Sequence, residues 1–260
     1  DMARMDVALL EILAADHPQT VRGTFYQATV RGIVDKTEAG YRTVQRALVL
    51  LRERGLLPYG YIADSTRWMR KPRSFDGLED ALRDSWRHYR RALWTSQRVN
   101  VEVWVEKDAL AGVLYEVTQE WDVPLMVTRG YSSLSFLYEC AASIAASEKP
   151  TCIYQFGDYD PSGEDIARDV EHKLRKYAPD AEIRFERVAV TPEQITKWNL
   201  PSRPTKNTDS RSKNFKGESV ELDAIPARTL KALVRACIER HVDEDILERT
   251  QEIEEAERES

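Results

Sequence analysis

The chain has 260 residues, of which 42% are hydrophobic and 32% charged, and its mean hydropathy is −0.54. This length allows one large domain or two modest ones. No apolar run is long enough to cross a bilayer and the N-terminus shows no signal-peptide pattern, so we expect neither a membrane protein nor a secreted one. Cys140, Cys152 and Cys237 form no CxxC or Cys/His metal pattern. They predict reduced core residues in a cytoplasmic protein.

The net charge of −6 is unevenly distributed. Residues 1–100 contain 17 Lys and Arg against 12 Asp and Glu, a net charge of +5, whereas residues 101–260 contain 21 against 32, a net charge of −11. Nine of these acids lie in the stretch 242–260. The basic N-terminal part is therefore able to bind phosphate groups despite the overall sign, although arginines that only solvate helices would give the same count.

Residues 1–75 have the pattern of a winged-helix DNA-binding domain. Apolar periodicity predicts helices over 5–15, 20–34 and 37–54, the last with Val44, Ala47, Leu48 and Leu51 inward and Gly55 as its stop. A short hairpin is expected over 56–64. The helix over 37–54 would then be the recognition helix, with Arg42 and Arg46 presented to DNA one turn apart. Three helices that pack without DNA would give much the same pattern.

Residues 76–98 predict a connecting helix, and residues 99–200 alternate between strand and helix patterns. Strands that alternate with helices imply parallel pairing, so we expect an α/β fold with a Rossmann-like sheet. Residues 201–260 predict a polar loop, a helix from Arg228 onward and an acidic tail. The loop is either disordered or becomes ordered on a phosphate backbone. The expected strands span 99–105, 124–130, 151–158 and 182–190. The expected helices span 108–121, 132–147, 161–178 and 228–260.

Three acidic residues stand at the ends of two predicted strands. Asp158 and Asp160 follow the apolar run 152–156, and Glu106 ends the strand that contains Val101, Val103 and Val105. Carboxylates at the exit of a buried strand are costly to desolvate unless they are paired or bind a cation. Because catalytic groups gather at the carboxyl ends of parallel strands, these three acids predict a Mg²⁺ site that acts on phosphate.

Structural roles compete with this interpretation. Asp160 precedes Pro161, which is the ordinary pattern of a helix N-cap followed by proline. Glu106 is also able to pair with Lys107 or Arg129. Asp158 is harder to explain structurally, because it comes directly off an apolar strand.

Three segments, VEKDAL, TRGYSSLSFLYE and GDYDPSGEDI, resemble in order the Toprim domain of the A subunit of type IIB topoisomerases (topoisomerase VI) and of the related meiotic double-strand-break transesterase. The chain looks like a compact, mobile-element version of that family, which places a winged helix before Toprim. The resemblance implies Mg²⁺ bound by Glu106, Asp158 and Asp160, with Glu106 also catalytic. Its Arg-x-x-Tyr-Tyr motif is similar to RGTFY, which implies Tyr26 as the nucleophile and Arg22 as its partner.

The resemblance also implies partners. DNA would contact Arg42, Arg46, Lys107 and Arg129, and two copies would form a homodimer in which the tyrosine of one subunit acts at the metal site of the other. An unbroken connecting helix would hold Tyr26 away from the aspartates of its own chain. The family uses a separate ATPase subunit, and this chain has no P-loop.

The expected function is Mg²⁺-dependent DNA cleavage by tyrosyl transesterification. One alternative is a Toprim nuclease that cleaves hydrolytically, with Tyr26 a core residue. Another is a DNA-binding protein without catalysis. Tyr41, Tyr59 and Tyr61 are rival tyrosines near Tyr26.

Overall fold

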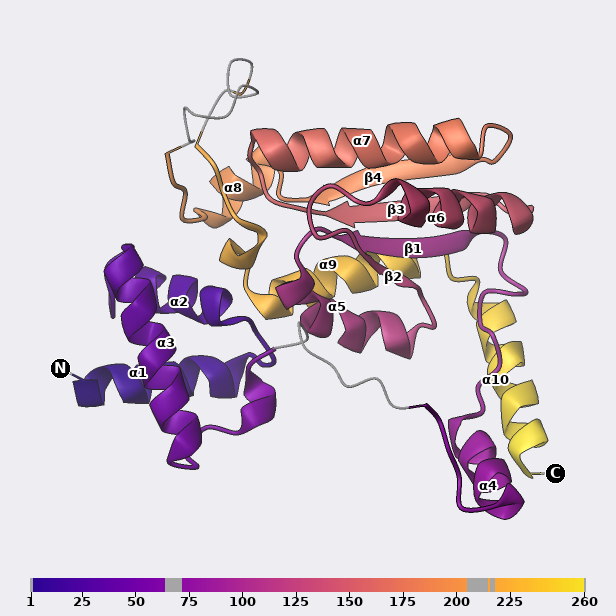
Figure 1. The fold of residues 1–260 in the computed structure, drawn as a ribbon, viewed down its shortest axis with the longest axis horizontal. Coiled ribbons are helices and arrows are strands. Elements are labelled where there is room, and N and C mark those ends of the chain that lie inside the picture. The colour runs from indigo at the N-terminus through magenta and orange to yellow at the C-terminus, as the bar shows by residue number, and fades with distance from the viewer. Residues whose placement is uncertain (1, 64–71, 205–214, 216–217, 260) are drawn as a thin grey trace.

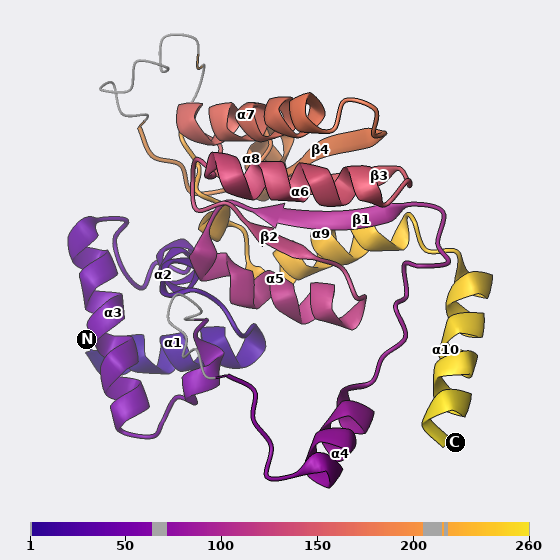
Figure 2. The same cartoon turned by 45° about the vertical axis from the view of Figure 1, so that its right-hand side comes forward.

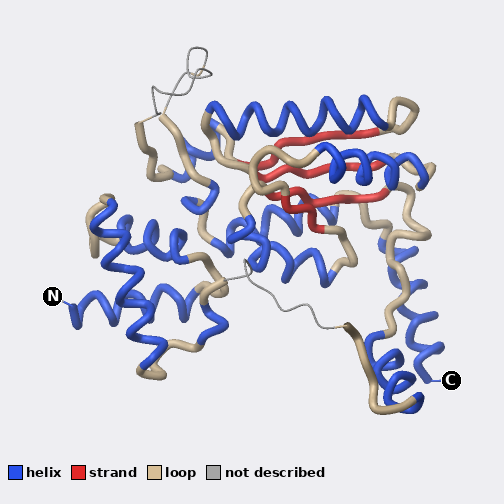
Figure 3. The backbone as a smooth tube through the Cα atoms, viewed as in Figure 1, coloured by secondary structure: helices blue, strands red, loops and turns tan. Residues whose placement is uncertain are grey.

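The computed structural model describes residues 2–63, 72–204, 215 and 218–259. A group of N-terminal helices lies beside a layered α/β body, and a pair of helices projects on the opposite side (Figures 1 and 2). Helices, strands and loops are distinguished in Figure 3. Within the described residues, no helix is both long enough and apolar enough to cross a membrane.

The three N-terminal helices are confirmed. They are α1 (Met2–Ala15), α2 (Val21–Val30) and α3 (Glu38–Glu53). Both α2 and α3 begin at a threonine N-cap, because the Oγ1 atoms of Thr20 and Thr37 accept the backbone N–H of Gly23 and Gly40 at 2.8 and 3.0 Å. After α3 the chain turns at Gly55, whose φ of +70° favours glycine. The four apolar residues predicted to face inward from this helix are all buried.

The hairpin predicted over 56–64 is wrong for residues 56–63, and residue 64 lies outside the described part. Pro58 supplies no N–H for a strand ladder, and the chain instead forms the 3₁₀ helix η1 (Tyr59–Tyr61). Its backbone is held by Arg52, which donates to Tyr59 O at 2.8 Å, and by a bridge between Gln19 and Ile62. The helices of the proposed winged helix are therefore present, but residues 56–63 do not form the hairpin that would be its wing.

The connecting helix predicted over 76–98 is shorter than expected. Helix α4 spans Leu78–His88, and residues 89–98 form a loop. The loop carbonyls bond elsewhere: Lys149 Nζ donates to the carbonyl oxygens of Trp94, Thr95 and Gln97 at 2.9, 2.6 and 3.0 Å. A distant ammonium thus satisfies acceptors that a helix would have used.

A four-stranded, entirely parallel sheet forms the centre of the molecule, with strand order β2-β1-β3-β4. This confirms the predicted α/β class. Two helices cover each face (Figure 1). The strands are β1 (Asn100–Val105), β2 (Leu125–Val127), β3 (Thr151–Phe156) and β4 (Ile183–Ala189); α6 (Leu134–Ala146) and α7 (Pro161–Tyr177) cover one face, and α5 (Asp108–Glu120) and α9 (Ala227–Glu239) the other.

Strand β1 shows why the alternating pattern in its sequence does not mean an exposed face. Val101, Val103 and Val105 pack toward α5 and α9, whereas Trp104 packs toward α6 and α7. Glu102 on the second face is only 8% exposed, and its carboxylate accepts the indole N–H of Trp104 at 2.8 Å. Both faces of the strand are therefore covered, as is usual for parallel sheets.

The C-terminal part departs from the single predicted helix. Helix α9 ends at Glu239, and α10 (Glu244–Glu259) begins after a break and lies beside α4, away from the sheet (Figures 1 and 2). Before α9, the described segment 218–225, which contains the 3₁₀ helix η3 (Leu222–Ala224), crosses the end of the sheet. Helix α8 (Pro192–Trp198) follows β4. Most of the predicted polar loop, residues 205–214 and 216–217, lies outside the described residues.

Candidate functional site

Glu106 and Asp158 lie side by side because β1 and β3 are neighbouring parallel strands that end together. Val105 is in register with Phe156, and the Oε2 atom of Glu106 accepts the backbone N–H of Asp158 at 3.2 Å. A Cβ atom on Gly157 would lie 2.8 Å from that same Oε2, so a larger residue here would displace the Glu106 carboxylate. Burial, and then the negative charge of Asp158, raise the pKa of Glu106 to about 7.

The two aspartates have different surroundings. The Oδ1 atom of Asp158 accepts the backbone N–H of Leu222 at 2.8 Å, and burial raises the pKa of this carboxyl. Asp160 is the N-cap of α7, since its Oδ1 accepts the N–H of Gly163 at 2.8 Å and Pro161 follows it. The structural role foreseen for Asp160 is thus confirmed, and its other oxygen lies 3.9 Å from Arg203.

Lys107 does not pair with Glu106 but reaches into a cluster of three other acids. Its Nζ atom lies 3.1 Å from Asp158 Oδ1, 2.9 Å from Asp223 Oδ2 and 3.5 Å from Glu221 Oε2. Burial by itself would lower the pKa of Lys107, but the three carboxylates outweigh it and raise the pKa. The ammonium is therefore a fixed cation inside the site.

Two further acids, Glu221 and Asp223, were not predicted from the sequence, and both belong to the 218–225 segment. Their carboxyl groups are buried beside Lys107, and Asp223 also accepts a hydrogen bond from the Thr20 hydroxyl at the start of α2. A local signal was present, because acids alternate with apolar residues in VELDAI. Val220 and Leu222 are almost fully buried, as a segment that crosses the core requires.

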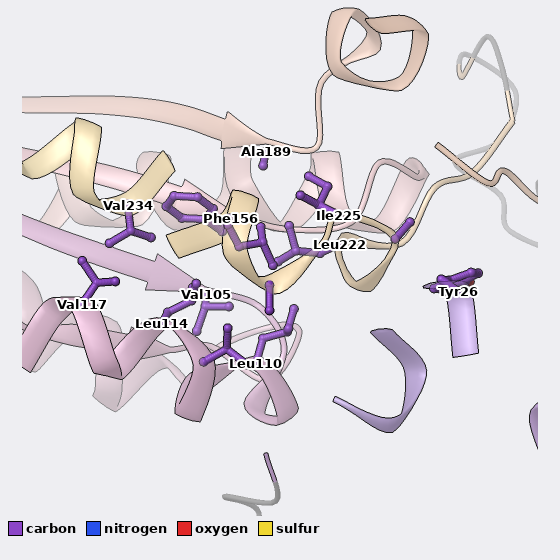
Figure 4. Packing of buried hydrophobic residues seen from close by; sticks show 14 of the residues in the cluster. Tyr26, Val105, Leu110, Leu114, Val117, Phe156, Ala189, Leu222, Ile225 and Val234 are labelled. Atoms are coloured by element: carbon purple, nitrogen blue, oxygen red, sulfur yellow. The ribbon is translucent and has the colours of Figure 1, made fainter. Parts of the chain in front are cut away.

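Tyr26 lies next to this cluster in its own chain. It is 4% exposed, its ring lies 5.6 Å from Lys36 Nζ, and the charge of Arg22 lies close enough to affect its pKa. Burial, and then the charge of Glu221, raise its pKa to about 12, against the opposing effect of nearby cations that include Lys107. Figure 4 shows Leu222 between Tyr26 and the sheet residue Phe156. The expected unbroken helix is wrong, since α4 spans only Leu78–His88, and Tyr26 lies within electrostatic range of Glu221 and Lys107 in its own chain.

The three rival tyrosines differ in their surroundings, and Tyr41 lies beside the cluster. The guanidinium of Arg22 lies 4.3 Å from the centroid of the Tyr41 ring. Tyr41 also lines a cleft of about 510 Å³ together with Arg22 and Lys107. Tyr59 is exposed, and Tyr61 stacks on His17 with ring centroids 3.8 Å apart.

The other predicted DNA contacts stand apart from the buried cluster. Arg42 and Arg46 are exposed on α3, and Arg42 lies 3.9 Å from Glu38. Arg129 pairs with Asp108 at 3.0 Å, so it is not the partner of Glu106. Among the described residues, these three arginines form no ion pair with the acids of the site, and their role in DNA binding remains a prediction.

Glu106, Asp158 and Asp160 supply the oxygen ligands that Mg²⁺ prefers, and Glu106 is a partly buried carboxyl beside a second negative charge. The donor chemistry fits the ion. Within the part of the chain that the structure describes, however, no three acidic, His or Cys side chains stand as a ready-made metal-binding group. The Asp158 and Asp160 oxygens are held by backbone N–H groups and by cations instead.

No protein-family model matches the chain, and no curated protein matches it significantly.

Proposed function

We propose that this protein binds DNA and cleaves it with Mg²⁺ by tyrosyl transesterification. One observation carries the proposal: four segments far apart in the sequence contribute charged side chains to one buried cluster at the carboxyl ends of β1 and β3. Burial of such networks of charged side chains costs desolvation free energy, and they are found preferentially at functional sites. The contributing residues are Arg22 from α2, Glu106 and Lys107 after β1, Asp158 and Asp160 after β3, and Glu221 and Asp223 from the 218–225 segment.

In this proposal Glu106, Asp158 and Asp160 hold Mg²⁺, which when bound neutralises nonbridging phosphate oxygens. The Tyr26 hydroxyl attacks phosphorus, a Tyr–O–P bond forms, and the bond to one deoxyribose oxygen breaks. The phenolic proton is lost to a base and the leaving oxygen gains a proton. Arg22 and Lys107 supply positive charge near the reacting group, which stabilises the phenolate and the transition state.

A hydrolytic nuclease is the second candidate, and one observation favours it. Tyr26 is 4% exposed and its pKa is raised to about 12, which makes the phenol a poorer nucleophile than a free tyrosine. In that case water attacks phosphorus and the tyrosine is a core residue. A non-catalytic DNA-binding protein is the third candidate, supported by Lys107, which already neutralises part of the acidic cluster.

Incubation with supercoiled plasmid, with and without Mg²⁺, tests the proposal. Samples are denatured with detergent and run on a gel before and after protease digestion. We expect Mg²⁺-dependent nicked or linear DNA that carries covalently bound protein. Cleaved DNA without attached protein would instead support the hydrolytic nuclease, and intact plasmid that is still bound would support the non-catalytic protein.

A further inference from the structure

Glu221 is the centre of a second set of contacts, which involves arginines. Its Oε1 lies 2.8 Å from Arg203 Nη1, and its Oε2 lies 3.5 Å both from Arg22 Nε and from Lys107 Nζ. Three cations thus surround one carboxylate. Arg203 follows α8 and Arg22 belongs to α2, so Glu221 brings together two arginines that are 181 residues apart in the sequence.

The exposure of these side chains shows which side of the contact faces solvent. The Glu221 side chain is 7% exposed, whereas those of Arg22 and Arg203 are 35% and 40% exposed. The carboxylate is therefore buried on the inner side of two arginines whose side chains remain partly exposed to solvent. If the Glu221 carboxylate occupied the position of a bound anion, it would lie on the solvent-exposed side of the two arginines instead.

The backbone around both partners is fixed. Arg203 and Ser219 exchange backbone hydrogen bonds of 2.8 and 2.9 Å, and so do Tyr159 and Val220. Leu222, which follows Glu221, is fully buried. The backbone of Arg203 is thus held by hydrogen bonds, and its guanidinium also lies 3.9 Å from Asp160. An arginine whose backbone is already held in place loses less conformational entropy when it binds a ligand.

We propose that Arg22 and Arg203 form a phosphate clamp, positioned from beneath by Glu221, that binds a backbone phosphate of the DNA substrate. Guanidinium forks match the geometry of phosphate oxygens and bind them with charge-assisted hydrogen bonds. The inference rests on the proposed function, because it places the clamp beside Asp160 and Tyr26. It adds Arg203 as a ligand-binding residue and Glu221 as a positioning residue.

The test is binding of a fluorescent DNA duplex without Mg²⁺ over a range of salt concentrations, together with plasmid cleavage. We expect Arg203→Gln to weaken binding about tenfold and to reduce the salt slope by about one unit, as loss of one phosphate contact does. Arg203→Lys keeps the charge and should retain the slope but lose part of the affinity. Arg235→Gln is the matched control, because Arg235 pairs with Glu120 at 2.7 Å and is also 40% exposed. This pair lies away from the site, since Glu120 ends α5 about 18 Å along the helix from Asp108, which begins it.

The Glu221→Gln variant shows whether Glu221 positions the two arginines or only competes with phosphate through its negative charge. If Glu221 positions the arginines, this variant binds DNA more weakly than wild type although it carries one negative charge less, and Glu221→Asp recovers part of the loss. Tighter binding by Glu221→Gln would show that the carboxylate competes with phosphate, and would overturn the positioning role.

The outcomes also separate this inference from the proposed function. Wild-type protein that cleaves DNA, with Arg203→Gln unchanged in affinity and slope, overturns the clamp and leaves the function standing. Wild-type protein that binds DNA through Arg203 but cleaves none keeps the clamp and rejects cleavage. Wild-type protein that neither binds nor cleaves DNA rejects both.

Discussion

The ammonium of Lys107 lies 3.1 Å from Oδ1 of Asp158, so the residue directly after Glu106 neutralises the aspartate at the end of the neighbouring strand. The same ammonium contacts Asp223 and Glu221. One lysine therefore balances carboxylates from two distant segments, and the stability of the site depends on it.

Replacement of Lys107 by Met should cost about 3–5 kcal/mol of unfolding free energy, because it leaves buried carboxylates without their counter-charge. Lys231→Met is the matched control. Lys231 is similarly buried, but its partner Glu116 is 44% exposed, so we expect a loss of about 1 kcal/mol. Urea unfolding of both variants at pH 7 measures the difference. Equal losses would mean that the cluster around Lys107 is solvated rather than buried.

Asp158→Asn should abolish Mg²⁺-dependent cleavage while the fold persists. The amide oxygen of asparagine still accepts the Leu222 N–H, and Lys107 keeps Asp223 as a partner. Asp169→Asn is the control, since Asp169 pairs with Lys173 on α7 and takes no part in the proposed chemistry. Plasmid cleavage and thermal unfolding are measured on both. A variant that cleaves as fast as wild type would show that Asp158 is not part of the site.

The sequence could predict what local patterns determine. Valines that alternate along β1 predicted a strand, the spacing from Val44 to Leu51 predicted α3, and parallel topology brought Glu106 and Asp158 together. Contacts between distant segments were beyond such patterns. Lys107 and Asp223 are 116 residues apart, and no periodicity links them. The loop at 89–98 was mistaken for helix for the same reason, since the carbonyls there bond with Lys149.

Exposed arginines on α3 supply the next prediction, which concerns DNA affinity. Arg42→Ala combined with Arg46→Ala should weaken DNA binding and reduce the salt slope by up to about two units, because two phosphate contacts are lost. Arg83→Ala with Arg87→Ala removes the same charge with the same spacing from α4 and serves as control. Fluorescence anisotropy at several salt concentrations measures both slopes. Equal effects of the two pairs would indicate a general dependence on charge rather than a recognition helix.

His241 gives the fold a pH dependence near neutrality. Its Nε2 lies 2.6 Å from the Tyr154 hydroxyl, and burial, followed by the positive charges of Arg184 and Arg240, lowers its pKa below the usual 6.5, against the effect of Glu186. The stabilisation that this histidine contributes is therefore present above pH 6.5 and is lost as pH falls through 6.5 toward the lower folded-state pKa.

Replacing this histidine by glutamine keeps a hydrogen-bond acceptor for the tyrosine and removes the titration. Unfolding free energies of His241→Gln should therefore decline less between pH 7.5 and about 5.5 than those of wild type. His172→Gln, at an exposed position on α7, is the control. An identical decline in wild type and His241→Gln would assign the pH dependence to other groups.

The last prediction concerns Tyr26 and the subunit in which it acts. Tyr26→Phe should abolish the covalent protein–DNA adduct with little loss of stability, because the buried ring is retained, whereas Tyr59→Phe should leave the adduct unchanged, since Tyr59 is exposed. Full cleavage by Tyr26→Phe without an adduct would favour the hydrolytic nuclease.

Mixing two inactive chains separates action within one chain from action across a homodimer. Because Tyr26 lies close enough to Lys107, Arg203 and Glu221 of its own chain for their charges to affect its pKa, we expect it to act there. A mixture of Tyr26→Phe and Asp158→Asn chains should then remain inactive, since neither chain has a complete site. Single-strand cutting by the mixture would instead show that the tyrosine of one subunit reaches the site of the other, which requires a two-fold dimer. Sedimentation of the mixture, with and without DNA, shows whether the two chains associate at all. An inactive mixture supports action within one chain only if mixed dimers are present.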